Sequence, residues 1–387
     1  MYHFFFLLLL FFSLLEFLGW KNKLIFKFIS FLMLLLVALK YGQGSDYFSY
    51  VELINRLANL VEESINNSSQ VSLNQEIGFS YLSYLWIKIL KLSAELLIAV
   101  LSTLSFYFII PFIKKYSPLP VTSLFIFYCT FYLIYPFSIL RQSICISIFV
   151  LYLIPLLFEK KYFKYFLFSA LLALIHSSAA ILFILPVVNW IKLEKFHTIF
   201  IISLVSLCIG LIMNRFLFSY FEIIDFLANK AEYYERTTSI DILALLLRIF
   251  IFIPIVILSK YYEKDSIKAM FLKIYTFGFF LYLIFISSSL ISSRLNVYMR
   301  YFEMILLADS CVYLFKRYGK SVLLNYSYII FIMTVLYVNN INSFIAQGTY
   351  YGSVNFYNYP YVSIFNKKKI VETRYIPPYF QRFIQND

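Results

Sequence analysis

The sequence predicts an all-α, polytopic integral membrane protein, on the basis of three observations. Hydrophobic residues make up 62% of the 387 residues and charged residues only 14%, whereas roughly a quarter of a soluble domain is charged. The mean hydropathy is +0.80. Apolar runs of about 20 residues, the length that crosses a bilayer as a helix, recur along the chain. Together these observations exclude a water-soluble domain.

About ten of the apolar runs are expected to span the membrane: 2–18, 25–40, 93–113, 121–138, 142–158, 198–218, 241–258, 269–290, 301–315 and 321–338. The first run has no Lys or Arg before it and no small-residue cleavage site, so we interpret it as a span and not as a signal peptide. Residues 77–91 are short for a span and suit a re-entrant or interfacial helix. We therefore expect a membrane domain over 1–340 and an extracytoplasmic tail over 341–387.

Lysine indicates the orientation of the chain. With the N-terminus outside, the lysine-rich loops lie in the cytoplasm, as positively charged loops do. This topology requires residues 166–190 to enter and leave the membrane on the same side, as a re-entrant hairpin broken near His176. The alternative is a plain span, which would place the lysine-rich loops 259–268 and 316–320 outside; we favour the hairpin for that reason.

Arginine shows the opposite distribution. In this topology the outside segments and outer membrane edges carry Arg56, Arg141, Arg236, Arg294 and Arg300. Because a guanidinium binds phosphate or carboxylate as a planar fork, we interpret these arginines as contacts for an anionic ligand, with snorkelling side chains as the alternative. The basic residues are scattered, so the net charge of +13 provides no basic face for nucleic acid.

Two extracytoplasmic loops are expected, over 41–78 and 219–240, each with an amphipathic segment for the membrane interface. In the first loop, Gly42 and Gly44 permit a tight turn, and Asp46 can cap the helix that follows. Asp46 is thus a candidate functional carboxylate, with capping as the alternative. Apolar side chains then recur at helical spacing, at Tyr47, Tyr50, Val51, Ile54, Leu57, Ala58 and Val61.

Three polar sites interrupt the apolar segments. Arg141 and Gln142 stand between two expected spans; snorkelling would explain the arginine but not the neutral donor and acceptor beside it. His176 lies within an apolar segment, where a polar ring is costly and an imidazole suits acid–base chemistry; a hydrogen-bonded core histidine is the alternative. Arg294 and Arg300, the latter beside Tyr301, are a candidate pyrophosphate clamp. No ATP-binding or metal-binding motif is present, so no cofactor or metal is expected.

Five short motifs, in this order, resemble those of the EpsG-like family of Wzy-type polysaccharide polymerases. They are GQGSDYFSY (42–50), EIGFSYLSYL (76–85), LRQSICISIF (140–149), LIHSSAAIL (174–182) and SRLNVYMRYF (293–302). Ser45 stands where the family's Gly-Thr-Asp pattern has Thr. The resemblance covers most of residues 1–340 and does not extend to 341–387.

The resemblance implies a GT-C-like glycosyltransferase of the bacterial inner membrane, with its active site facing the periplasm or exterior. Its substrates would be polyprenyl-pyrophosphate-linked oligosaccharides, joined into O-antigen or capsule, and a chain-length regulator is a candidate partner. Arg141 would neutralise the pyrophosphate leaving group, and Asp46 or His176 would accept the proton of the acceptor hydroxyl. The residues expected to bind pyrophosphate or sugar are Gln142, Arg294, Arg300, Tyr301 and Tyr50.

Three other functions share part of this pattern. A lipid-linked oligosaccharide flippase is disfavoured because no internal repeat is visible, and a membrane acyltransferase because the arginines lie outside. An O-antigen ligase has the same electrostatic requirements as a polymerase, and only the family motifs favour the polymerase.

Overall fold

The computed structural model describes residues 1–67, 76–188, 190–191, 193, 196–212, 240–258, 262, 267–318, 322–378 and 380–381. These residues are predominantly helical, and among them there are two isolated β-bridges but no β-strand. The expected loop at 219–240 lies outside the described residues except for its last position. The chain divides into two compact units, the first of Met1–Ile154, Leu167–Ala179 and Leu323–Asp387, and the second of Pro155–Phe166 and Ala180–Val322.

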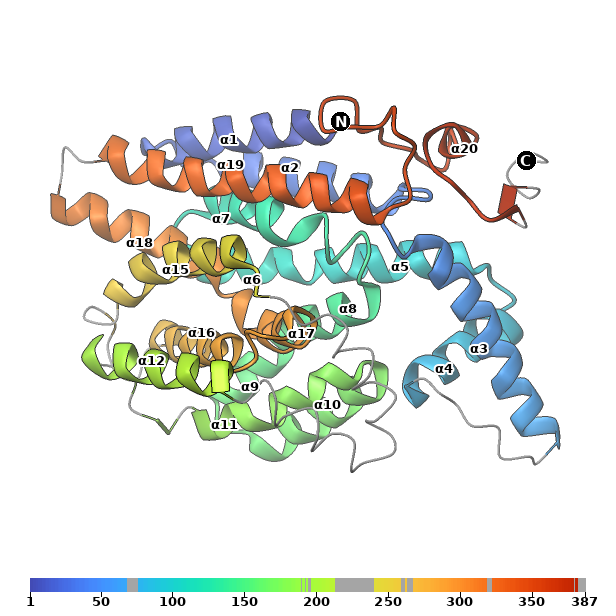
Figure 1. The fold of residues 1–387 in the computed structure, drawn as a ribbon, viewed down its shortest axis with the longest axis horizontal. Coiled ribbons are helices and arrows are strands. Elements are labelled where there is room, and N and C mark those ends of the chain that lie inside the picture. The colour runs from blue at the N-terminus through green and yellow to red at the C-terminus, as the bar shows by residue number, and fades with distance from the viewer. Residues whose placement is uncertain are drawn as a thin grey trace. The chain divides into compact units, whose positions relative to one another are not determined.

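The first unit is a bundle in which α5 packs on both α2 and α8, α1 packs on α7, and α3 packs on α4 (Figure 1). The last long helix also returns to the first, since the ring of Tyr337 stacks on Phe6 with centroids 4.4 Å apart. The helices of this unit are α1 (Tyr2–Phe17), α2 (Lys23–Ala38), α3 (Tyr47–Asn67), α4 (Ile77–Tyr84), α5 (Ala94–Tyr107), α6 (Ile109–Tyr116), α7 (Pro120–Phe127), α8 (Leu140–Ile148), α19 (Val322–Gln347) and α20 (Lys369–Thr373).

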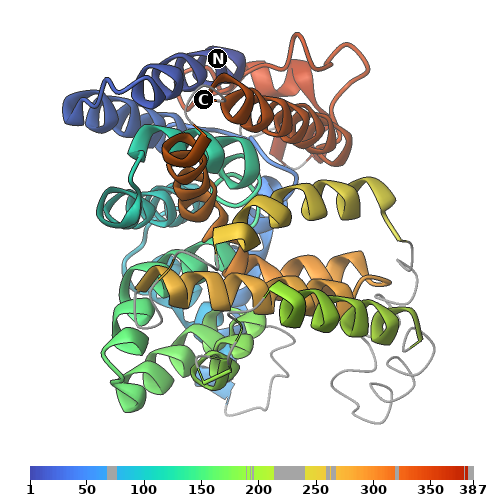
Figure 2. The ribbon, with the colours of Figure 1, turned by 90° about the vertical axis from the view of Figure 1, so that its left-hand side faces the viewer.

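In the second unit α16 is the central helix, and α12, α17 and α18 pack against it (Figure 2). Phe252 of α15 stacks on Phe279 of α16 at 3.8 Å between ring centroids. The helices are α11 (Leu185–Val188), α12 (Phe196–Ile212), α15 (Ile242–Ile257), α16 (Ile267–Ile284), α17 (Ser289–Arg300) and α18 (Glu303–Tyr318). Two further helices, α9 (Ile154–Phe158) and α10 (Tyr162–Ile175), belong partly to each unit.

The structure supports a polytopic membrane protein. Four helical stretches are long and apolar enough to cross a membrane: Ala94–Tyr116, Leu140–Phe158, Ile267–Ile284 and Tyr326–Gln347. Shorter apolar helices occupy several of the other expected spans, including Tyr2–Phe17 and Ile242–Ile257. The helix expected over 121–138 ends earlier, at Tyr132, because Pro136 lacks a backbone donor and disfavours helical geometry in the residue before it.

The expected break at His176 is confirmed. The helix α10 ends at Ile175, and a 3₁₀ segment, η4, runs over Ser177–Ile184. The chain reverses between them, since the hydroxyl of Tyr165 donates to the carbonyl of Leu182 and Phe166 stacks on Phe183. The polar residues His176 and Ser177 therefore lie at the tip of a helical hairpin.

The amphipathic character predicted for α3 is also confirmed. Each apolar residue named from its helical spacing is at most 8% exposed: Tyr47, Tyr50, Val51, Ile54, Leu57, Ala58 and Val61. This face is buried against α4 and α5, so it packs on other helices of the protein and not on the membrane interface that was expected for it. The polar residues of α3 are left on the opposite face.

Candidate functional site

A partly buried carboxylate joins three of the sequence motifs in the first unit. Glu76 immediately precedes α4, and its Oε2 accepts a hydrogen bond from Nη1 of Arg141 at 2.5 Å. Its other oxygen, Oε1, lies 3.4 Å from Nδ1 of His176 and accepts hydrogen bonds from the backbone N–H and the hydroxyl of Ser177, at 3.2 and 3.0 Å. A glutamate, an arginine and a histidine from separate segments thus form one cluster.

Two aromatic rings pack beside the guanidinium of this cluster. The centre of the Arg141 guanidinium lies 5.3 Å from the ring of Phe79 and 5.9 Å from the ring of Tyr50. The side chain of Arg141 is only 16% exposed. These rings limit the directions in which the guanidinium can point, and Tyr50 is one of the residues expected to bind substrate.

Gln142, the neighbour of Arg141, is buried and contacts the tip of the helical hairpin. Its side chain is 1% exposed, and its Nε2 donates to the hydroxyl of Ser178 at 3.2 Å. The pair Arg141–Gln142 therefore faces the pair Ser177–Ser178 at the tip of the helical hairpin. Gln142 fixes the start of α8 relative to that tip.

Gly78 allows the close approach that brings Glu76 to His176. A Cβ atom at this position would lie 2.8 Å from the carbonyl oxygen of Leu174, closer than real Cβ contacts come. Glycine is thus required where α4 crosses the end of α10, directly before His176.

The glycine-containing loop before α3 is held against the turn that precedes Arg141. Gly42 and Gly44 have φ angles of 63° and 100°, a region that favours glycine, and this agrees with the predicted tight turn. The buried Lys40 donates to the carbonyls of residues 136 and 137 at 2.7 and 2.8 Å. The N–H of Ser45 donates to the hydroxyl of Ser138 at 3.0 Å.

Arg374, far away in the sequence, closes the same loop from the C-terminal segment. Its Nη1 donates to the carbonyls of Gly42 and Gly44, both at 2.8 Å. Its guanidinium lies over the rings of Phe48 and Tyr350, and the residue is 3% exposed. The C-terminal segment is therefore part of the framework that positions the start of α3.

The Glu76 carboxylate is ionised at neutral pH. Burial raises its pKa, but the hydrogen bond with His176, the charge of Arg141 and the N–H of Ser177 act in the opposite direction and outweigh burial. The net effect holds the pKa of Glu76 well below its usual range. With Nδ1 facing this carboxylate, the imidazole of His176 has Nε2 on its far side.

Among the described residues no group of His, Cys, Asp and Glu could hold a metal ion. No curated protein and no solved structure gave a significant match to the chain. The model of the EpsG family matches residues 23–363 of the 387. The chain belongs to the EpsG family.

EpsG-family proteins are Wzy-like polymerase-type membrane proteins. Membership agrees with the predicted family and with the apolar helices, and it indicates a multi-pass membrane protein of polysaccharide biosynthesis. The match includes all five motifs, and it ends before the C-terminal segment that contains Arg374.

The second unit of this EpsG-family protein contains another charged cluster. Arg300 makes two hydrogen bonds to Glu303, from Nε at 3.1 Å and from Nη2 at 3.4 Å, and Glu303 is fully buried. The guanidinium of Arg248 lies 4.8 Å from the ring centroid of Tyr282, and the charges of Arg300 and Glu303 both act on it. The negative charge of Glu303 therefore acts on both Arg300 and Arg248.

The other residues expected to bind substrate in this unit lie apart from each other. Arg294 is exposed and Tyr301 fully buried. Arg294 and Arg300 are six residues apart in α17, so they project from different faces of that helix. The joint clamp of Arg294 and Arg300 remains a prediction, and Arg248 is a second arginine of the same unit that acts on Arg300.

Asp46 stands directly before α3, one helical turn from Tyr50, whose N–H donates to its carbonyl. The negative charge of Asp46 acts on Tyr50 together with the positive charge of Arg141. Asp46 thus lies near the cluster, on the helix that supplies Tyr50.

Sequence reasoning did not assign a role to Glu76. The only available signal was its position: an acidic residue just before an apolar helix, at the start of the second motif. Glu303 and Arg374 were also missed as site residues, since Glu303 acts through Arg300 on the preceding helix and Arg374 through a loop more than 300 positions away in the sequence.

Proposed function

We propose that this protein is a polysaccharide polymerase of the bacterial inner membrane. It transfers a growing glycan from polyprenyl pyrophosphate onto the sugar of a lipid-linked repeat unit at the outer face of that membrane. The observation that carries the proposal is the contact of one ionised carboxylate, Glu76, with both Arg141 and His176. Family membership supports the reaction class.

The cluster supplies two groups for glycosyl transfer, a cation for the leaving group and a base for the acceptor. The acceptor hydroxyl attacks the anomeric carbon of the donor glycan while the C–O bond to the pyrophosphate breaks. The electron pair of that bond leaves with the pyrophosphate, and the Arg141 guanidinium neutralises its added negative charge. The proton of the hydroxyl passes to His176 at Nε2.

Glu76 is a positioning residue in this scheme. It aligns the imidazole through Nδ1, as a carboxylate does for a histidine base, and it holds the guanidinium through Nη1. We assign the base to His176 rather than Asp46 because His176 shares its carboxylate with the leaving-group cation. Tyr50 and Gln142 support the cluster from α3 and α8.

The second unit offers a further cationic site. Donor and acceptor each carry a pyrophosphate, so the reaction benefits from more than one arginine site. We assign Arg300, with Arg248 beside it, to a lipid pyrophosphate. Arg294 and Tyr301 remain predicted substrate contacts.

The experiment that tests the proposal is deletion of the gene in its native host, followed by complementation with the wild type or Arg141→Lys. The surface glycan is separated on a gel, and membrane insertion is checked by immunoblot of a tagged protein. We expect the deletion to leave a single band of core plus one repeat unit and the wild type to restore the ladder. Arg141→Lys should insert normally but restore almost no ladder, because lysine keeps the charge and loses the planar fork.

Two results would contradict the proposal. Loss of every repeat-bearing band in the deletion strain would indicate a flippase or a ligase. A near-normal ladder with Arg141→Lys would show that the guanidinium does not handle the leaving group.

A further inference from the structure

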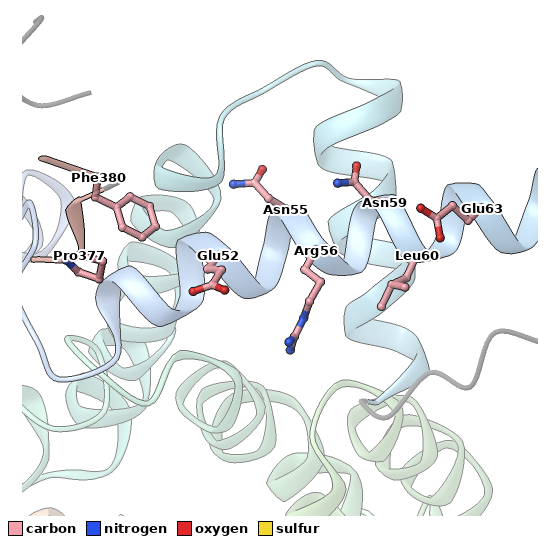
Figure 3. Close-up of a pocket in the computed structure, with 8 residues that line it drawn as sticks. All are labelled: Glu52, Asn55, Arg56, Asn59, Leu60, Glu63, Pro377 and Phe380. Carbon is pink, nitrogen blue, oxygen red and sulfur yellow. The ribbon is translucent and has the colours of Figure 1, made fainter. Parts of the chain in front are cut away.

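A groove runs along the solvent face of α3 in the first unit (Figure 3). Its volume is about 630 Å³, and the C-terminal segment closes one end of it. Its lining consists of Glu52, Asn55, Arg56, Asn59, Leu60 and Glu63 of α3 together with Pro377 and Phe380. We call this feature the α3 groove.

The lining has the chemistry that binds sugars. Amide, carboxylate and guanidinium groups are planar and present several donors or acceptors each, which matches the closely spaced hydroxyl groups of a pyranose. Asn55 and Asn59 project side by side from α3 (Figure 3). The ring of Phe380 is partly exposed, and its open side can pack on the C–H face of a sugar. A cofactor pocket would instead be mostly apolar and enclosed.

The α3 groove differs in charge from the proposed pyrophosphate site. Two glutamates, Glu52 and Glu63, accompany a single arginine, Arg56, in the lining. This excess of negative charge disfavours a pyrophosphate, which needs an excess of cationic groups. The groove therefore suits the glycan portion of a lipid-linked substrate and not its lipid anchor.

The wall formed by the C-terminal segment is held in a defined place. Phe380 packs on Phe48 with ring centroids 5.3 Å apart, and Phe48 in turn lies under the guanidinium of Arg374. Arg374 is bonded to the glycine loop before α3. The family match ends at residue 363, so this wall lies outside the matched residues.

The α3 groove faces away from the reacting cluster. Asn59 lies nine residues after Tyr50, and at 100° per residue this places the two side chains on opposite sides of α3. A glycan in the groove would therefore be held at a distance from the bond being formed.

We propose that the α3 groove is a glycan-binding site that retains the growing polysaccharide between transfer steps, and that Phe380 and the C-terminal segment adapt it to this protein's own glycan. The inference rests on the proposed function. Retention raises the local concentration of the chain end, so each chain receives more repeat units before it dissociates.

The test measures binding directly, without catalysis. Surface glycan is released from the native host by mild acid, fractionated by length, labelled at its reducing end and titrated against the purified full-length protein in detergent. Asn59→Ala and Phe380→Ala each remove one lining side chain and should weaken binding about fivefold or more, the size expected for a lost sugar–ring or paired hydrogen-bond contact. Glu63→Gln, which lies in the groove, is compared with Glu62→Gln, which is next to it but does not line it.

The expected result is saturable binding by the wild type and Glu62→Gln and weaker binding by Asn59→Ala, Phe380→Ala and Glu63→Gln. No saturable binding by the wild type, or equal binding by all the proteins, would overturn the inference. Because the readout needs no transfer step, a protein that binds glycan in this groove but fails to polymerise would contradict the proposed function alone. The converse result, a polymerase whose groove variants bind like the wild type, would contradict the groove alone.

Discussion

Replacing Glu76 with glutamine is the sharpest test of the cluster, because it preserves shape and removes one charge. The carboxylate accepts hydrogen bonds from Arg141 and Ser177 and contacts His176. A hydrogen bond to an ionised group contributes about 1 kcal/mol more than a hydrogen bond to a neutral group. The two main partners, Arg141 and His176, contact a carboxylate whose side chain is only 14% exposed. We therefore expect Glu76→Gln to lose about 2–3 kcal/mol of interaction free energy within the cluster.

If that loss falls on the transition state, it corresponds to a decrease of about 30- to 150-fold in the polymerisation rate. The assay measures glycan ladder formation in membranes from the deletion strain that contain equal amounts of tagged wild type or variant. Glu62→Gln is the matched control: Glu62 pairs with Lys88 at 2.8 Å, but the two side chains are 41% and 29% exposed, so that pair contributes about 0.5 kcal/mol.

A rate for Glu76→Gln within about threefold of the Glu62→Gln rate, at equal protein level, would refute the reasoning; threefold is about 0.7 kcal/mol, close to the value of a surface pair. The acid dependence gives an independent check. Because the pKa of Glu76 is lowered from 4.5, its contribution to stability is complete above that pH and is lost as the pH falls further. The difference in Tm between wild type and Glu76→Gln should therefore shrink below about pH 4.5.

The remaining predictions concern the base and the close helix contact. His176→Gln should lower the rate of polymer formation about 100-fold or more, because it removes the proposed base, whereas Asp46→Asn should lower it less; the reverse result would make Asp46 the base. Gly78→Ala should lower the free energy of unfolding by about 1–3 kcal/mol and reduce polymer formation, because the added Cβ would clash with the carbonyl of Leu174. Gly352→Ala, where a Cβ meets nothing within 4 Å, is the control, and equal thermal stability of the two variants would contradict the packing described here.

The sequence correctly predicts those features that depend on residues close together along the chain. The apolar face of α3 follows from helical spacing alone, and the positive φ angles of Gly42 and Gly44 follow from the absence of a Cβ. The break at His176 was visible because three polar residues interrupt an apolar segment. The helix expected over 121–138 is too long because apolar composition does not reveal the helix end that Pro136 imposes.

The contacts between the residues of the cluster could not be predicted from such local patterns. Arg141 and His176 were both candidates, but their common partner Glu76 is 65 positions from Arg141 in the sequence. Such a contact depends on how α4, α8 and the hairpin pack, which no local pattern encodes. The same holds for Arg374, which bonds to Gly44 across 330 positions.

The bond between Arg374 and the glycine loop has a consequence for biosynthesis. The loop carbonyls of Gly42 and Gly44 are made early by the ribosome, while the guanidinium that fixes them is made more than 300 residues later. A nascent chain can insert most of its helices and still lack the brace at the start of α3. The start of α3, which supplies Tyr50 to the cluster, would thus acquire this brace only after Arg374 has been synthesised.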